Sequence, residues 1–150
     1  MSETSPLQLP MSIADINAMI ARIPYVQFLG IQVEAEGDGI ITRLDFHQNL
    51  VGNPVLPALH GGVIGAFLET TAIIALSREA RLPELPKTVD ITVDYLRSGR
   101  PLTTYGRATV TKHGRRVANM QVVAWQDDPA KPIAAAHGHF LLKIAENAEK

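Results

Sequence analysis

The sequence predicts an α+β domain in which an antiparallel sheet wraps around one long central helix. The segment 61–80 is apolar on nearly all sides at helical spacing, which indicates a helix that is buried over most of its surface. Short strand-like segments joined by tight turns surround it in the sequence, and such connections favour antiparallel pairing. A sheet that curls around the helix would bury it, giving one layered core.

A short helix and two strands are predicted before the central helix. Ser12 is placed to cap a helix whose apolar residues recur at helical spacing over 13–23. Pro24 is expected to end this helix. Strands are predicted around 28–36 and 40–47, because the turn sequence EGDG separates two strand-like stretches.

A loop over 48–59 leads into the central helix, and four strands follow that helix. In TVDITVDYL the apolar and polar residues alternate, which predicts one buried and one solvated face. The residues expected on the buried face are Val89, Ile91, Val93 and Tyr95. The remaining strands are predicted at 102–112, 115–126 and 133–144, with HG and DDPAKP at the turns between them.

Length and composition indicate one ordinary globular domain. The chain has 150 residues, with a loose tail over 1–10 and a division into an N-terminal tail and helix (1–24) and the main domain (25–150). A formal net charge of −1 gives no attraction to nucleic acid or an anionic membrane. The absence of cysteine excludes disulfides and thiolate metal sites.

Targeting signals are also absent from the sequence as it stands. The N-terminus lacks the basic start and apolar core of a signal peptide. Glu69 and Arg78 interrupt the longest apolar run, so no membrane-spanning segment is expected. The expected location is the cytoplasm.

The start of the central helix is a candidate oxyanion site. The first N–H groups of a helix have no partner within it and lie at the positive end of its dipole. Gly61 and Gly62 have no side chains, so a substrate carbonyl can approach this backbone closely. The alternative is that His60-Gly61-Gly62 forms only a tight turn at the entry to the helix.

Glu69 is a candidate general base or nucleophile. It is the one acid between Asp45 and Glu79, and the helix around it is apolar. The alternative is a partly exposed position on a thin polar stripe with Thr70 and Thr71.

Gly61 and Glu69 are too far apart to serve one substrate within a single helix. Eight residues at the α-helical rise separate them by about 12 Å along the axis. Reacting groups must approach within about 3–3.5 Å. If both groups act, the acid is expected from another subunit, in a twofold dimer with two equal sites.

These segments resemble the hotdog-fold thioesterases, in particular the phenylacetate-pathway (PaaI-like) branch. The resemblance rests on HGGVIGAFLET after VGNPVLPAL, followed by TVDITVDYLRSG, and covers roughly 25–145. It implies a sheet wrapped around a central helix, dimers or dimers of dimers, and hydrolysis of acyl-coenzyme A thioesters without a cofactor.

The resemblance also implies a role for individual residues. Gly61 falls at the oxyanion-binding N–H, and Glu69 at the catalytic carboxylate, where many relatives have Asp. Asn53 resembles the loop Asn or Gln that orients substrate or water, although its spacing to His60 is one residue longer. Thr88 falls where some relatives hold the attacking water; the alternative is a strand-start hydroxyl with no partner.

His60 is expected to position the turn rather than transfer a proton, because Glu69 already supplies a base. Arg97 is assigned to substrate binding, as one of several basic turn residues suited to the phosphates of coenzyme A. His137 and His139 share one face of a strand, but no third ligand is evident, so no metal is expected.

The sequence therefore predicts an acyl-coenzyme A thioesterase that works as a homo-oligomer. The alternative is a protein that binds acyl-coenzyme A or an acyl group without hydrolysing it, and Glu69 distinguishes the two because a pure binder has little use for this acid. Acyl-coenzyme A hydration is disfavoured because its characteristic Asp and His arrangement is missing. A purely structural dimer would leave the glycines and the acid unexplained.

Overall fold

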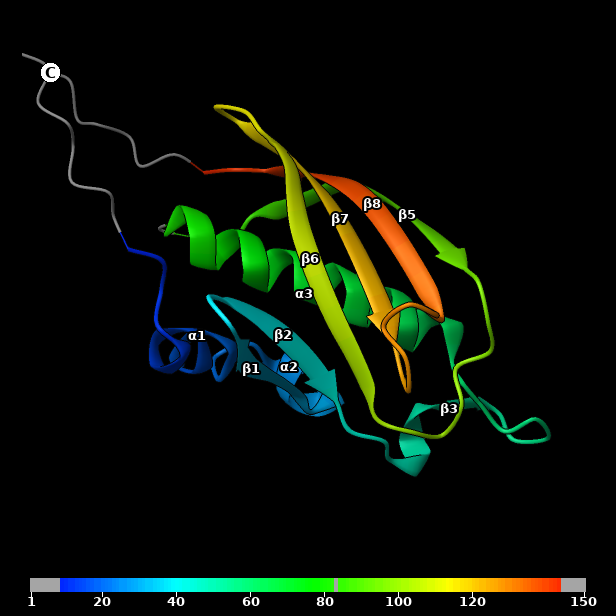
Figure 1. Ribbon diagram of the computed structural model, residues 1–150. Coiled ribbons are helices and arrows are strands. Elements are labelled where there is room, and N and C mark those ends of the chain that lie inside the picture. The colour runs from blue at the N-terminus through cyan, green and yellow to red at the C-terminus, as the bar shows by residue number, and fades with distance from the viewer. Residues whose placement is uncertain (1–8, 83, 144–150) are drawn as a thin grey trace, which may run out of the picture.

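The computed structural model describes residues 9–82 and 84–143 (Figure 1). A six-stranded sheet curls around a long helix, α3. Two short helices lie beside the first strand, which forms one edge of the sheet. Residues 1–8 of the tail predicted over 1–10, and the chain after 143, lie outside the described residues. The elements are α1 (Ile13–Ile20), α2 (Pro24–Leu29), β1 (Ile31–Glu36), β2 (Gly39–Leu44), a 3-10 turn η1 (Gln48–Leu50), β3 (Val51–Asn53), β4 (Ala58–Leu59), α3 (Gly61–Ala80), β5 (Lys87–Tyr95), β6 (Thr104–His113), β7 (Val117–Trp125) and β8 (Ala134–Leu141).

The sheet is antiparallel throughout, as predicted, with the strand order β1-β2-β6-β7-β8-β5. Tight turns join β1 to β2 and β6 to β7, and the HG sequence lies at the second turn, where Gly114 N–H donates to the Val117 carbonyl. Strands β1 and β5 form the two edges. Strand β5 is the next element after α3 in the sequence, and this edge strand contacts the helix.

The central helix spans the predicted residues and is enclosed as predicted. It contacts β6 and β7 most extensively, and also β2, β5 and β8. Phe67, Leu68 and Leu76 are fully buried against the concave side of the sheet. Burial of such side chains from several directions is the main source of stability for a helix that has no single apolar face.

One expectation about this helix is wrong. Despite Glu69 and Arg78, α3 is long and apolar enough to span a membrane by length and composition alone. It is the one such helix in residues 9–82 and 84–143. Half of its most apolar window is buried within the fold. A core helix of a wrapped sheet satisfies the same criteria, and the position of α3 is that of a core helix.

The N-terminal region confirms one prediction and corrects another. Ser12 caps α1, and its side chain accepts a hydrogen bond from Asp15 N–H at 3.1 Å. Pro24 does not simply end a helix: it begins a second helix, α2, because proline suits the first turn, where an N–H has no helical partner. Gly30 ends α2 with φ +75°, so the strand predicted from residue 28 begins at Ile31.

The predicted buried face of β5 is only half-covered. Val89 and Tyr95 are 60% and 56% exposed, and Ile91 and Val93 are half-buried. The register against β8 shifts between Thr88 and Asp90, which is a β-bulge. Because β5 is an edge strand, apolar alternation in its sequence indicates an apolar face without specifying what covers it.

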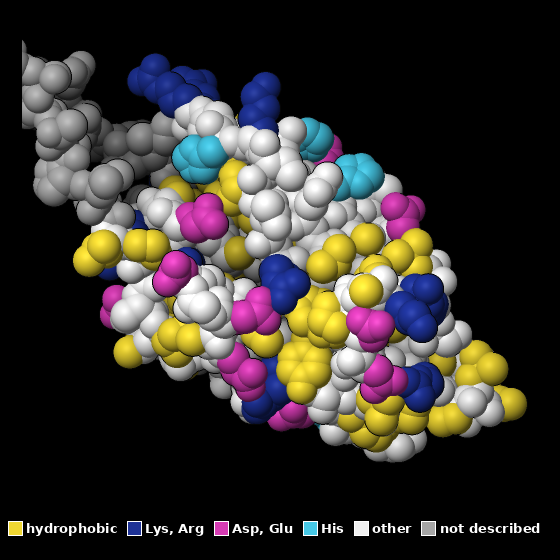
Figure 2. Space-filling model, in the orientation of Figure 1, with side chains coloured by type: hydrophobic (Ala, Val, Ile, Leu, Met, Phe, Trp, Pro, Cys, Tyr) yellow, Lys and Arg dark blue, Asp and Glu magenta, His cyan; other side chains and the backbone are white. Residues whose placement is uncertain are grey.

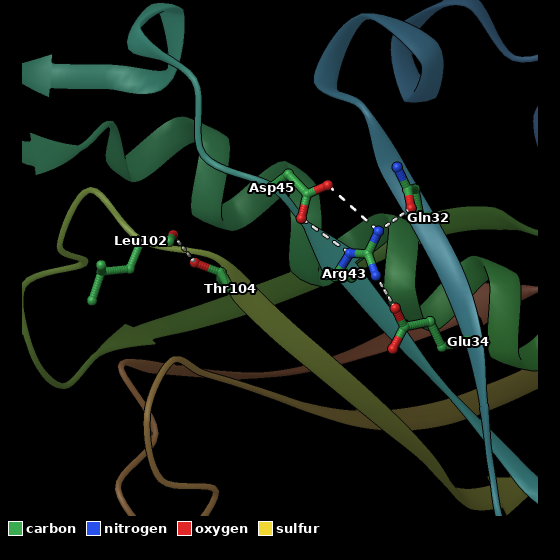
Figure 3. A network of polar contacts seen from close by, with 6 residues as sticks. All are labelled: Gln32, Glu34, Arg43, Asp45, Leu102 and Thr104. Carbon is green, nitrogen blue, oxygen red and sulfur yellow. Dashed lines mark hydrogen bonds and ion pairs between the residues drawn. The ribbon is translucent and has the colours of Figure 1, made fainter.

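A cluster of polar side chains joins β1 to β2 on the outer surface (Figure 3). The Arg43 guanidinium pairs with Glu34 and with Asp45, the latter at 3.0 Å, and donates to the Gln32 side chain. These groups are exposed or half-exposed, so each pair contributes little to stability. The cluster lies across the β1–β2 pair, and β2 in turn pairs with β6 in the main sheet.

A buried polar contact links α3 to the sheet at the middle of the core. The hydroxyl of Thr71 donates to the Phe67 carbonyl at 2.7 Å and lies 2.7 Å from the hydroxyl of Thr42 on β2. Gly106 on β6 lies directly above this pair. A Cβ at Gly106 would come within 2.6 Å of Thr42 Oγ1 and 2.9 Å of Thr71 Oγ1, so glycine is required for the helix to approach the sheet.

Gly106→Ala is therefore expected to lower the free energy of unfolding by about 1–3 kcal/mol, because the core must shift to admit one methyl group. Gly39→Ala is the matched control, since its Cβ would meet only the Glu36 carbonyl at an ordinary 3.6 Å. The control should change stability by less than about 0.5 kcal/mol. Urea unfolding at one fixed protein concentration measures both, and equal effects would contradict this account of the core.

Candidate active site

The first turn of α3 is organised by the side chain of His60. His60 is the residue that caps the helix, and its Nδ1 accepts a hydrogen bond from Gly62 N–H at 2.8 Å. A ring nitrogen accepts only through its lone pair, so this contact requires the tautomer with the proton on Nε2. His60 thus fills the place usually taken by Ser, Asp or Asn at a helix start.

This cap leaves one amide of the first turn open. The His60 carbonyl accepts from Val63 N–H at 3.0 Å and from Ile64 N–H at 3.2 Å. Gly62 N–H is held by the imidazole, whereas Gly61 N–H has no partner in the described parts of the chain. The arrangement therefore presents a single backbone donor, at the positive end of the helix dipole.

Two further residues, which the sequence pattern did not identify as site residues, shape this turn. Gly52 on β3 lies against His60: a Cβ there would meet His60 Cα at 2.7 Å and Cδ2 at 2.8 Å. Tyr95, at the end of β5, donates its hydroxyl to the Gly61 carbonyl at 2.7 Å, and its ring lies over Gly61. The alternating pattern of β5 indicated an apolar role for Tyr95 and gave no sign of this contact.

Glu69 lies in the middle of α3 and is held by a neighbour on the sheet. Thr88, at the start of β5, donates its hydroxyl to Glu69 Oε1 at 2.7 Å, and both residues are half-buried. The alternative for Thr88, a hydroxyl with no partner, is therefore wrong. A fixed carboxylate with one free oxygen can accept a proton or act as a nucleophile.

The structure keeps the two parts of the predicted site apart within one chain. Gly61 lies beside Tyr95 at the end of β5, whereas Glu69 lies beside Thr88 at its start. Along α3 the two residues are about 12 Å apart. A single chain therefore presents an open amide and a positioned carboxylate that do not converge.

Asn53 is the last residue of β3 and is exposed, directly before the loop that leads to β4 and the helix. Its side-chain oxygen accepts hydrogen bonds from the backbone N–H groups of Val55 and Leu56, at 3.0 and 3.3 Å. This is an Asx-type turn, in which the amide oxygen shapes its own loop. Val55 and Leu56 are 89% and 65% exposed at the tip, and Figure 2 shows hydrophobic side chains gathered at this end of the molecule.

The remaining candidates lie at the surface. Arg97 lies two residues beyond Tyr95, and its guanidinium donates a hydrogen bond to the Pro132 carbonyl at 2.8 Å. His139 Nδ1 contacts Asp90 Oδ1 at 2.7 Å, and this hydrogen bond holds the pKa of Asp90 below its ordinary value. In residues 9–82 and 84–143 no group of three or more metal-binding side chains comes together.

The role of His60 as a helix cap can be tested by substitution. His60→Ala should lower the free energy of unfolding by about 1 kcal/mol, because Gly62 N–H loses its acceptor. His60→Asn should recover part of that loss, since Asn is a strong capping residue. Both variants keep Cα and Cβ beside Gly52 and lose the imidazole Cδ2, so their difference in chemical denaturation isolates the cap. Equal losses in the two variants would show that the cap contributes nothing.

Comparisons with known proteins identify the family of this chain. Residues 56–133, just over half of the chain, match the Thioesterase superfamily. The medium/long-chain acyl-CoA thioesterase YigI of Salmonella typhimurium is 28% identical in an alignment of 124 residues, and the match covers 73% of this chain and 79% of that protein. A crystal structure from Chromobacterium violaceum is 40% identical and has a TM-score of 0.70, covering 89% of this chain and 93% of that chain.

A phenylacetic acid degradation-related protein from Ralstonia eutropha JMP134 shows the same fold. Its TM-score is 0.71 at 22% identity, covering 85% of this chain and 98% of that chain. Together with the antiparallel sheet and the enclosed helix, these matches confirm the predicted fold class. The chain therefore belongs to the thioesterase superfamily: it has the hotdog fold and is a thioester hydrolase.

Proposed function

We propose that the protein hydrolyses an acyl-coenzyme A thioester to the free acid and coenzyme A, at sites shared between two copies of the chain. The observation that carries this proposal is that one helix presents both an open amide, at Gly61, and a positioned carboxylate, at Glu69. The Salmonella relative acts on medium- and long-chain acyl-CoA, which supports this substrate class. The motif around His60 further suggests the PaaI-like branch of the superfamily, and we expect a cytoplasmic enzyme.

A second copy would bring the two groups together. The exposed apolar residues of β5 and its unpaired edge are surfaces that proteins commonly cover by association. A twofold arrangement pairs Glu69 of one copy with the start of α3 in the other and creates two equal sites. The partner copy is then necessary for activity, because it supplies half of each site.

The chemistry follows from these two groups. The acyl carbonyl oxygen accepts a hydrogen bond from Gly61 N–H, which stabilises the negative charge that develops during attack. Glu69 takes a proton from water as the water oxygen bonds to the carbonyl carbon, or it attacks that carbon itself and forms a mixed anhydride that water then opens. The carbon–sulfur bond breaks, the thiolate of coenzyme A takes a proton, and the carboxylic acid is released.

The other residues orient these groups. Thr88 holds one oxygen of Glu69, so the other oxygen faces the substrate or water in a fixed direction. His60 secures Gly62 N–H and thereby directs the carbonyl oxygen to Gly61, and Gly62 allows the substrate a close approach. Asn53 shapes the loop that precedes the helix, and we assign Arg97 to a phosphate of coenzyme A because a guanidinium suits that group.

The alternative function is binding of an acyl group or acyl-coenzyme A without hydrolysis. The hydrogen bond between Thr88 and Glu69 favours the enzyme, because a binder of thioesters gains nothing from a fixed carboxylate near the thioester. Thiol release from a panel of acyl-coenzyme A esters of increasing chain length separates the two functions. Binding without thiol release for every ester would establish the alternative.

The role of Gly61 can be tested with a proline, because the local geometry accepts one. Gly61 is the first residue of α3, and His60 before it is extended with φ −61° and ψ 131°, which a following proline requires. Gly61→Pro removes the N–H and adds a ring that starts at the Cβ position, and it should lower kcat by about 10²–10³-fold. Gly61→Ala keeps the N–H, and its Cβ would contact the Tyr95 ring at an ordinary 3.5 Å. The alanine variant should retain most activity in the thiol-release assay; equal losses would exclude the amide as the oxyanion donor.

The shared site can be tested by mixing inactive subunits. Glu69→Gln should lower kcat by about 10²–10⁴-fold while substrate binding is kept, because the amide cannot accept the proton. A mixture of Glu69→Gln and Gly61→Pro subunits should regain activity, since a heterodimer contains one site with both groups intact. Circular dichroism and subunit exchange of labelled chains serve as controls. Exchange without regained activity would place both groups of each site in one chain, or exclude them as partners.

A further inference from the structure

A pocket lies between α1 and the C-terminal part of α3, beyond Glu69 and far from Gly61. Its volume is about 640 Å³, within the range of sites that hold small organic molecules. The walls come from residues before, on and after α1 and from the end of α3 and the segment after it. They are formed by Met11, Ala18, Met19, Arg22, Ile23, Ser77, Leu82, Glu84 and Leu85.

One wall of this pocket carries a buried hydroxyl without a partner. Ser77 on α3 is 2% exposed, and its Oγ makes no hydrogen bond within the described residues. Thr71, earlier on the same helix, is equally buried but donates to the Phe67 carbonyl, so the helix itself is able to satisfy such a group. Buried hydroxyl groups are normally paired, and an orphaned one beside a cavity indicates a missing acceptor.

The charge at the rim indicates an anion. Arg22 follows α1, lines the pocket and has no ion-pair partner in residues 9–82 and 84–143. The other charged residue of the lining, Glu84, is paired with Lys143 at 2.7 Å. The rim therefore presents one uncompensated positive charge above an apolar interior.

We propose that this pocket binds an aliphatic carboxylate, separately from the site at Gly61 and Glu69. The carboxylate accepts hydrogen bonds from the Arg22 guanidinium and the Ser77 hydroxyl. The aliphatic tail lies against Met11, Met19 and Ile23, and methionine adapts to chains of different shape. This site is independent of the proposed hydrolysis, because none of its residues takes part in that reaction.

Dodecanoate, below its micellar concentration, is the probe, and isothermal titration calorimetry of the full chain is the measurement. Ala18→Trp should abolish binding, because Ala18 is exposed and the indole would block the pocket without disturbing the core. Ala14→Trp is the matched control: Ala14 is also exposed on α1, one turn earlier, and does not line the pocket. Absence of binding by the native chain, or equal binding by the two tryptophan variants, overturns the proposal.

The polar contacts have their own tests. Arg22→Gln should weaken binding at least tenfold, whereas Arg116→Gln, which removes an exposed charge elsewhere, should leave it unchanged. Ser77→Ala should weaken binding severalfold and remain folded, since the hydroxyl has no partner to lose. Dodecanol, which lacks the charge, should bind the native chain as weakly as dodecanoate binds the Arg22 variant.

A separate arm distinguishes this site from binding at the proposed active site. Glu69→Gln should bind dodecanoate with the affinity of the native chain, whether or not the protein hydrolyses thioesters. Binding that is altered by Glu69→Gln and unaffected by Ala18→Trp and Arg22→Gln would assign dodecanoate to the active site and overturn the proposal. None of these readouts depends on catalytic activity, so failure here leaves the proposed function standing.

Discussion

The enclosure of α3 by the curled sheet is the constraint on which the rest of the structure depends. A helix buried from several sides must approach the strands closely, and small residues on the sheet make this possible. Gly106 admits the hydroxyl pair of Thr42 and Thr71 at the centre of the contact. Because interiors are packed at crystal-like density, this contact fixes the position of the helix along the sheet and hence of both its ends.

The fixed start of α3 determines which backbone group is available to a substrate. The incoming loop is anchored by hydrogen bonds from His60 N–H to the Leu50 carbonyl and from Leu59 N–H to the Gly99 carbonyl. Within that frame, the imidazole and carbonyl of His60 take the N–H groups of the next three residues after Gly61. The open amide is therefore a consequence of the cap, and the glycines serve the cap as much as the substrate.

The sequence was most informative where a signal is local. The bounds of α3, the cap at Ser12 and the hairpin between β6 and β7 follow from periodicity, capping residues and turn residues within short windows. The order of helix and strands was enough to predict the fold class. Helix α2 was missed because a proline that begins a short helix and a proline that ends a longer one have similar sequence surroundings.

The candidate site was predicted only in part, because its contacts are not local. Gly61 and Glu69 were identified from residue types on one helix, yet the partners that hold them, Tyr95 and Thr88, lie on β5. No periodicity encodes a hydrogen bond across 19 or 34 positions. The exposure of Val89 was missed for a related reason: alternation indicates an apolar face but not whether the same chain covers it.

The side of α3 that β5 covers only in part is the side that a second copy of the chain would meet. Gly65, Glu69 and Ile73 recur every four residues, so they lie along one side of the helix, and all three are only half-buried. Suppose that the proposed second copy places its α3 antiparallel to this one. Glu69 of one copy then faces Gly61 of the other only if the two helices cross at Gly65, so that Gly65 of one copy faces Gly65 of the other. That midpoint residue has no side chain, so the two helices can come close there, as a carboxylate that must reach a neighbouring amide requires.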